Sequence, residues 1–137
     1  MMPLIPIGET SAIMDKCRLE EGDALHELSV TENIIDICLR HAQKHGARRI
    51  VRINLVLGEL TGIVDQCITF YWEMLAKDTI AAQAELVFRK VPVVARCREC
   101  GKEYRPEDLQ LTCPACGCDR AELVSGREFR VESIEVD

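Results

Sequence analysis

The chain of 137 residues is 47% hydrophobic and has a formal net charge of −6, which fits one compact domain with a small appendage. Acidic residues outnumber basic ones by 23 to 17. This balance argues against a nucleic-acid-binding protein, because contacts to phosphates need a surplus of Lys and Arg. No apolar run approaches the roughly 20 residues that cross a bilayer, so no membrane insertion is expected.

Residues 1–24 show no sustained hydrophobic period, and they mix Pro3, Pro6 and Gly8 with an acidic stretch over 20–23. Such a segment buries too little apolar surface to order itself. We therefore expect an extension that is disordered or loosely attached.

An amphipathic helix is predicted from Ser29 to just before Gly46. Ser29 and Glu32 have the spacing of a capping box. Apolar residues then recur at helical spacing, and they are Val30, Ile34, Ile35, Cys38, Leu39 and Ala42. His41 and His45 lie one turn apart, a spacing that could bind a metal but is more typical of a solvated helix face.

The next elements alternate between strand and helix patterns. Residues 49–57 predict a half-buried strand, with Val51, Ile53, Leu55 and Leu57 on one face and Arg52 and Asn54 on the other. After a turn over 58–62, a second helix is predicted to end near Lys77, with an apolar face formed by Val64, Cys67, Ile68, Tyr71, Met74 and Leu75.

Two further strands are predicted on either side of a cysteine-rich module. The first begins at Ala84, has Leu86 and Phe88 on one face, and runs toward Cys97. The second covers 129–136, where the apolar phase slips between Val131 and Ile134 and indicates a β-bulge.

The cysteine-rich module contains two Cys-x-x-Cys-Gly motifs, formed by Cys97 and Cys100 and by Cys113 and Cys116. Each motif places two thiolates on one side of a loop, and the pair completes a tetrahedron suited to Zn²⁺. Because all four positions are filled, zinc would have a structural role. Iron in the same site is the alternative, which metal analysis would distinguish. Cys118 is interpreted as a spare thiol.

Several basic residues lie around these motifs, and we interpret them as offsetting the negative charge of the thiolates rather than as contacts to phosphate. They are Arg96, Arg98, Lys102, Arg105 and Arg120. The chain has eight cysteines, but half of them belong to the motifs and no apolar leader follows the start, so a disulfide framework is not expected. A reducing, cytoplasmic location is expected instead.

The order of elements predicts an α+β fold in which two helices pack on a three-stranded sheet, with an inserted four-cysteine zinc ribbon. The predicted domains are an extension over 1–24, an α+β domain over 25–91 and 127–137, and a zinc-ribbon domain over 92–126. The sequence lacks a nucleophile elbow, a Gly-rich phosphate loop and a His-Glu-x-x-His motif. We therefore do not expect an enzyme.

His26-Glu-Leu-Ser-Val30, an amphipathic helix, a strand ending in Gly58-Glu59 and the inserted cysteine pairs follow one another in the sequence. In this combination the chain resembles the hydrogenase nickel-incorporation proteins of the HypA/HybF family over residues 25–137. The resemblance implies a nickel metallochaperone that helps to deliver Ni²⁺ to the large subunit of [NiFe]-hydrogenase and works with a maturation GTPase. It also implies that residues 25–91 and 127–137 form the nickel-binding domain.

The resemblance also implies a nickel site. The histidine of the family's Met-His-Glu motif binds nickel, which corresponds to His26, and the adjoining glutamate corresponds to Glu27. Asp65 matches a position that can be acidic in the family and is a weaker candidate. Nickel(II) favours tetragonal nitrogen ligation, so an imidazole beside a terminal amine and a backbone amide nitrogen makes a compact chelate.

The chain departs from the family in having Leu25 before His26, behind 24 further residues. One interpretation is that translation starts at Leu25 through a UUG codon, so that the extension is mis-annotated; cleavage before Leu25 and a genuine extension are the alternatives. The intact mass of the native protein distinguishes them. The sequence is also compatible with a homodimer.

Two other functions fit the motifs less closely. In the first, the chain is a zinc-ribbon adaptor between proteins and His26 binds nothing. In the second, iron in the four-thiolate site transfers electrons. Nickel titration tests the first and metal content tests the second.

Overall fold

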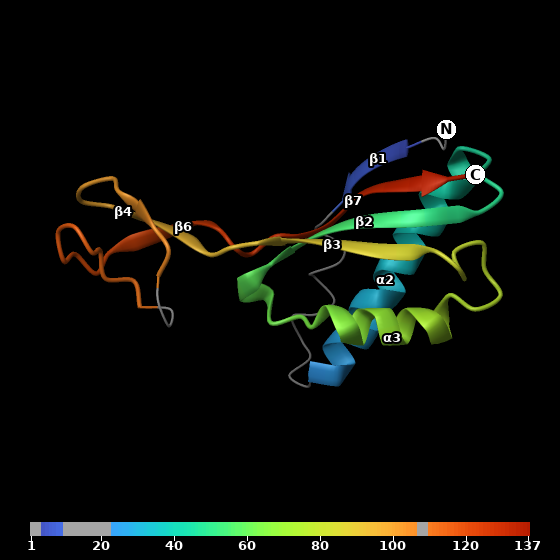
Figure 1. Cartoon of the computed structure of the whole chain (residues 1–137), viewed down its shortest axis with the longest axis horizontal. Coiled ribbons are helices and arrows are strands. Elements are labelled where there is room, and N and C mark those ends of the chain that lie inside the picture. Colours follow the sequence, from blue (N-terminus) through green and yellow to red (C-terminus); the bar gives the residue numbers. More distant parts are fainter. Residues whose placement is uncertain (1–3, 10–22, 107–109) are drawn as a thin grey trace.

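The computed structural model describes residues 4–9, 23–106 and 110–137, which form two lobes (Figure 1). The larger lobe contains β1 (Leu4–Glu9), α2 (Asp23–Lys44), β2 (Ile50–Gly58), the 3-10 turn η1 (Glu59–Thr61), α3 (Asp65–Leu75), β3 (Glu85–Val91) and β7 (Phe129–Val136). The smaller lobe contains β4 (Val94–Cys97), β5 (Glu103–Tyr104) and β6 (Ala121–Ser125). The α+β fold with an inserted ribbon is confirmed.

The sheet of the larger lobe has the order β1-β7-β2-β3, with β2 and β3 parallel and the other neighbours antiparallel. It therefore has a fourth strand that the sequence did not predict. This strand, β1, comes from the extension that was expected to be disordered. Its short apolar pattern, with Ile5 buried, is too brief to indicate a strand until β7 is beside it.

The predicted bulge in β7 is confirmed. Asn54 of β2 is opposite Ser133, while Leu55 is opposite Val131, so Glu132 is the extra residue. As a result, Val131 and Ile134 both face the core although they are three positions apart.

The helix α2 begins at Asp23, six residues before the predicted start. Ser29 and Glu32 lie inside the helix, so the capping box was wrong. The Glu27 side chain accepts a hydrogen bond from the Val64 amide, and this contact favours the earlier start. Thr31 Oγ1 also donates a hydrogen bond back to the Glu27 carbonyl oxygen at 2.5 Å. The predicted apolar face is confirmed, since Val30, Ile34, Cys38 and Ala42 are fully buried.

The buried face of α3 differs from its prediction. Ile68 and Trp72 are its buried residues, and Trp72 Nε1 donates a hydrogen bond to the Ala81 carbonyl oxygen at 3.0 Å. Val64 and Met74, which were expected in the core, are 43% and 54% exposed. Ile68 was predicted on the buried face, and Trp72, four residues later, was missed because the alternative apolar stripe was longer.

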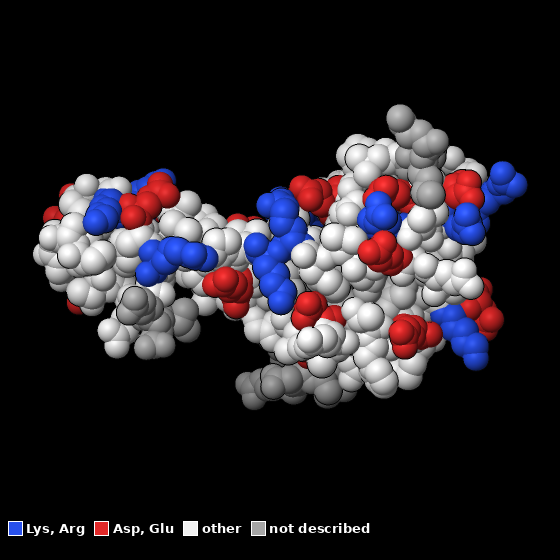
Figure 2. Space-filling view, viewed as in Figure 1, with Lys and Arg blue, Asp and Glu red and all other residues white. Residues whose placement is uncertain are grey.

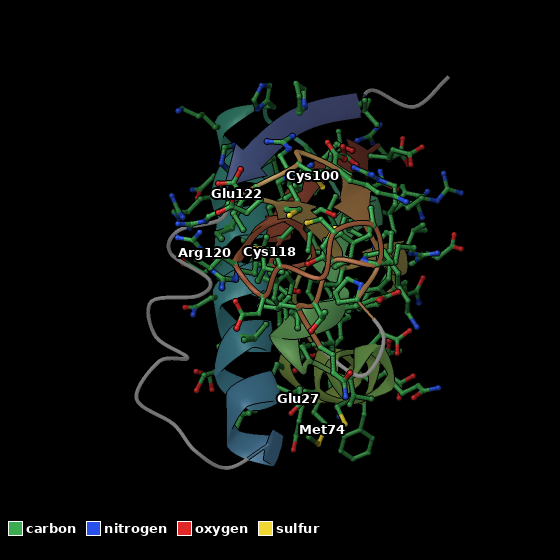
Figure 3. All side chains as sticks on the ribbon, turned by 90° about the vertical axis from the view of Figure 1, so that its left-hand side faces the viewer. Glu27, Met74, Cys100, Cys118, Arg120 and Glu122 are labelled. Carbon is green, nitrogen blue, oxygen red and sulfur yellow. The ribbon has the colours of Figure 1, made fainter. Side chains whose placement is uncertain are left out.

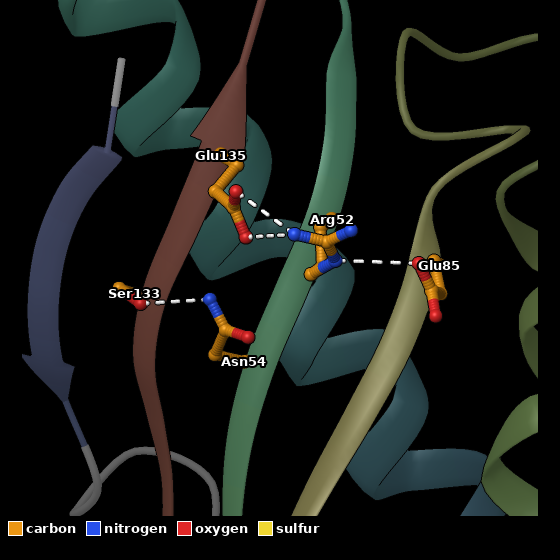
Figure 4. Close-up of polar contacts among 5 residues, drawn as sticks. All are labelled: Arg52, Asn54, Glu85, Ser133 and Glu135. Carbon is orange, nitrogen blue, oxygen red and sulfur yellow. Dashed lines mark hydrogen bonds and ion pairs between the residues drawn. The ribbon is translucent and has the colours of Figure 1, made fainter. Parts of the chain in front are cut away.

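Both helices cover one face of the sheet (Figure 1), where the core lies. The opposite face has polar contacts between neighbouring strands (Figure 4). Arg52 donates to both oxygens of Glu135 at 2.9 and 2.8 Å and forms an ion pair with Glu85 at 3.2 Å. These contacts join the three strands β7, β2 and β3 across the exposed face.

The two lobes meet where Gly58 passes Gly126. A Cβ atom on Gly58 would overlap the Gly126 carbonyl, so only glycine allows this close approach. Gly58 N donates to the Glu128 carbonyl oxygen at 2.6 Å, and Leu60 N donates to that of Gly126 at 2.8 Å. The backbone itself therefore connects the sheet to the ribbon.

Candidate metal centres

The two cysteine motifs form matching loops. Gly101 N donates to the Cys97 carbonyl oxygen at 3.0 Å, and Gly117 N donates to that of Cys113 at 2.9 Å. Both glycines have positive φ, 76° and 75°, because the chain must turn back around a central point.

The four thiols converge on one point between these loops. The ligand atoms of Cys97, Cys100, Cys113 and Cys116 lie within 4.8 Å of one another. Sγ of Cys97 is 3.5 Å from that of Cys116, and Sγ of Cys100 is 3.6 Å from that of Cys113. Sulfur ligands about 2.3 Å from a tetrahedral zinc stand roughly 3.8 Å apart. The donor set and its spacing therefore fit Zn²⁺.

Backbone amides favour the ionised form of the first thiol in each loop. The amides of Cys100 and Glu99 lower the pKa of Cys97 to about 6, and the amides of Cys116 and Ala115 lower the pKa of Cys113. Thiolates are the form that binds a metal. In contrast, burial raises the pKa of Cys38 in α2, which makes that thiol an inert core residue.

The ribbon has a small core of its own, in which Ala95 and Tyr104 are buried beside Cys97 and Cys113. Tyr104 Oη donates to the Leu111 carbonyl oxygen at 2.6 Å. A core of this size supplies little stability, so a metal at the four thiols would contribute much of the folding energy.

Two basic residues of the ribbon pair with nearby carboxylates rather than with the thiols. Arg96 lies 2.9 Å from Glu103 and 3.3 Å from Glu122, and Arg120 forms an ion pair with Glu99. On the face seen in Figure 2, blue and red side chains are interspersed over the smaller lobe. This arrangement amends the prediction that all five basic residues offset the thiolates.

The predicted nickel-site residues lie elsewhere, at the start of α2 and α3. Figure 3 shows Glu27 well away from Cys100 and Cys118. Glu27 is only 2% exposed, and its Oε2 accepts a hydrogen bond from Val64 N at 3.0 Å. Because Asp65 follows Val64, this bond places the Glu27 side chain beside the backbone that leads to Asp65. His26 lies in α2, but its side chain is outside the described residues.

Asp65 is the first residue of α3 and is half-buried. Its Oδ1 accepts from Gln66 N at 3.1 Å, and its Oδ2 lies 3.6 Å from Lys90 Nζ. The link between Glu27 and Val64 was missed by the sequence reasoning. It could have been found by extending the buried stripe of Val30 and Ile34 one turn backward, because this places Glu27 on the buried face.

A family model described as "Hydrogenase/urease nickel incorporation, metallochaperone, hypA" matches residues 25–136. This chain belongs to the HypA family. A hydrogenase maturation factor HypA of Dehalococcoides mccartyi is 42% identical over 113 residues, covering 82% of this chain and 95% of the relative. One from Caldanaerobacter subterraneus is 37% identical over 115 residues, covering 82% of this chain and all of the relative.

Solved HypA structures share the fold. The solution structure of the Ni metallochaperone HypA from Helicobacter pylori is 25% identical, with a TM-score of 0.57 over 80% of this chain and 96% of that one. A second HypA solution structure is also 25% identical, with a TM-score of 0.64 over 82% and 97% of the two chains. The family resemblance seen in the sequence is confirmed. Neither described helix is long and apolar enough to span a membrane.

Proposed function

We propose that this HypA-family protein carries Ni²⁺ to the large subunit of [NiFe]-hydrogenase during maturation. The observation that carries this proposal is the family match over residues 25–136, which includes both the His26-Glu27 motif and the four-cysteine ribbon. A maturation GTPase and the hydrogenase large-subunit precursor are the proposed partners, in the cytoplasm. The protein's role is to bind and release a metal rather than to catalyse a reaction.

In this proposal, His26 is the principal nickel ligand, with Glu27 and Asp65 as weaker candidates. The hydrogen bond between Glu27 and Val64 supports the arrangement, because it joins α2 to the residue that precedes α3. A site with few side-chain ligands at the start of a helix would exchange nickel faster than a closed four-thiolate site, as delivery requires.

We assign the four-cysteine site to structural zinc. Its four thiols lie within 4.8 Å of one another, a closed donor set that leaves no position for cargo. Two metals are then separated by ligand chemistry, thiolate for zinc and nitrogen for nickel. The same thiol set would accept iron, and metal analysis of the purified protein decides between them.

Nickel titration of the zinc-loaded protein tests the cargo role. His26→Ala should abolish specific nickel binding while leaving zinc content and the free energy of unfolding nearly unchanged. His45→Ala is the matched control, because His45 is an exposed histidine that directly follows the other end of α2. In cells, His26→Ala should also abolish hydrogenase maturation. Normal hydrogenase activity in cells that have only this variant would contradict the nickel role and favour the adaptor.

A further inference from the structure

The strand β1 adds to the family fold, because the family match begins at residue 25 and β1 comprises Leu4–Glu9. It forms the outer edge of the sheet and pairs with β7. Without it, β7 would be the edge strand, with one side of its backbone open to pairing.

The contacts of β1 with the lobe are substantial. Ile5 is 5% exposed, lies opposite Ile134 and belongs to the core. Ile7 packs against the same core. Leu4, on the other face of the strand, is 58% exposed. The outer side of β1 is a poor template for a further strand, because Pro6 has no amide hydrogen and Gly8 has a φ of 70°.

The sequence of β7 can pair with itself in antiparallel orientation. With the two-fold axis between Glu132 and Ser133, Val131 lies opposite Ile134 of a second copy, and Phe129 lies opposite Val136. All four are buried core residues on the helix-covered face. This match depends on the bulge at Glu132. In a strand without a bulge, Val131 and Ile134 would point to opposite faces of the sheet.

Charges agree with the same register. Arg130 lies opposite Glu135 of the second copy, so the two-fold axis creates this opposite-charge pair twice. Among the described residues, Arg130 has no ion-pair partner of its own. Glu135 contacts Arg52 on the β2 side and lies opposite the apolar Leu4 on the β1 side.

We propose that β1 is a guard strand for the β7 edge, and that release of β1 allows β7 to pair with β7 of a second copy of this chain. The dimer would have one continuous sheet across a two-fold axis. The partner is a second copy because the apolar register and the charge pairs both follow from the sequence of β7 itself.

Ile5→Asp in the full chain tests this proposal, because a carboxylate at the buried site should release β1. Leu4→Asp is the matched control, since it adds the same charge to the exposed face of the same strand. Sedimentation over a range of concentrations should show a twofold rise in mass, relative to the unchanged chain, for Ile5→Asp only. Adding Arg130→Glu to Ile5→Asp should reverse the rise, because it places like charges opposite each other.

Hydrogen exchange identifies the strands involved. In Ile5→Asp, the β1 amides should lose protection while the β7 amides keep it through the new pairing. Two results would overturn the proposal: a mass that does not rise once the β1 amides have lost protection, or a rise that Arg130→Glu does not reverse.

Discussion

The buried carboxylate of Glu27 in α2 accepts a hydrogen bond from the amide of Val64, the residue that precedes α3. It is adjacent in sequence to His26, the proposed nickel ligand. Glu27, which joins α2 to the start of α3, and the proposed ligand His26 are therefore neighbours in sequence. The hydrogen bond of Glu27 holds the backbone next to His26 in place. Substitution of Glu27 would weaken nickel binding through the loss of this hydrogen bond, even if the Glu27 oxygens never contact the metal.

Glu27→Ala should lower the free energy of unfolding by about 1–3 kcal/mol, because it removes a buried side chain and the hydrogen bond that its carboxylate accepts from the Val64 amide. Glu27→Gln should lose less, since its amide oxygen still accepts a hydrogen bond. Urea unfolding measures both changes. Glu32→Ala, at an exposed position of the same helix, is the control. Equal free energies of unfolding for Glu27→Ala and Glu32→Ala would show that the hydrogen bond of Glu27 contributes nothing to stability.

At the scale of elements, the lobes have different sources of stability. The larger lobe has a continuous apolar core under its sheet, whereas the ribbon has a small core around the cysteines. The ribbon strands β4, β5 and β6 are short and would be marginal without a metal. Loss of the metal should therefore unfold one lobe and not the other.

Replacing any one of Cys97, Cys100, Cys113 and Cys116 by Ala should release the zinc and unfold the ribbon. NMR signals of the sheet and helices should persist, because their core contains none of these residues. Cys118→Ala is the control, since that thiol contacts Arg120 N at 3.4 Å and is not among the four converging ligands. A variant of the four that keeps stoichiometric zinc and native ribbon signals would refute the assignment.

The elements that the sequence predicted well are those with strong local patterns. β7 has the predicted bounds of Phe129–Val136, and the cysteine motifs converge because their spacing alone specifies a closed site. The features it missed depend on distant contacts. β1 needs β7 as a partner from the far end of the chain, and the early start of α2 coincides with the contact of Glu27 with Val64.

At the scale of the molecule, the junction of Gly58 and Gly126 fixes how the lobes meet. The chain passes between lobes twice, after β3 and before β7. Ser125 Oγ donates to the Pro92 carbonyl oxygen at 2.8 Å, which ties the two passages together. An apolar hollow of about 490 Å³ lies beside this junction, lined by Leu60, Thr61, Val93, Pro106, Leu111, Leu123 and Arg127.

Gly58→Ala should destabilise the larger lobe by about 1–3 kcal/mol, because the new methyl group overlaps the Gly126 carbonyl and forces the crossing apart. It should also change the orientation of the ribbon, which residual dipolar couplings measure. Gly62→Ala, in the same turn, meets open space but has a φ of 72°, so it should cost stability through backbone strain and still leave that orientation unchanged. An unaltered orientation in Gly58→Ala would show that the crossing does not set the arrangement of the lobes.

The position of β7 between β1 and β2 determines the order in which the protein can assemble during synthesis. The cysteines of the ribbon leave the ribosome before β7 does, and their contacts are local in sequence. The ribbon can therefore bind the proposed zinc on the nascent chain, whereas the sheet cannot close until β7 emerges and inserts between strands made earlier. Zinc uptake should precede completion of the lobe proposed to bind nickel, so a shortage of zinc would leave the nascent chain without an ordered ribbon when β7 arrives.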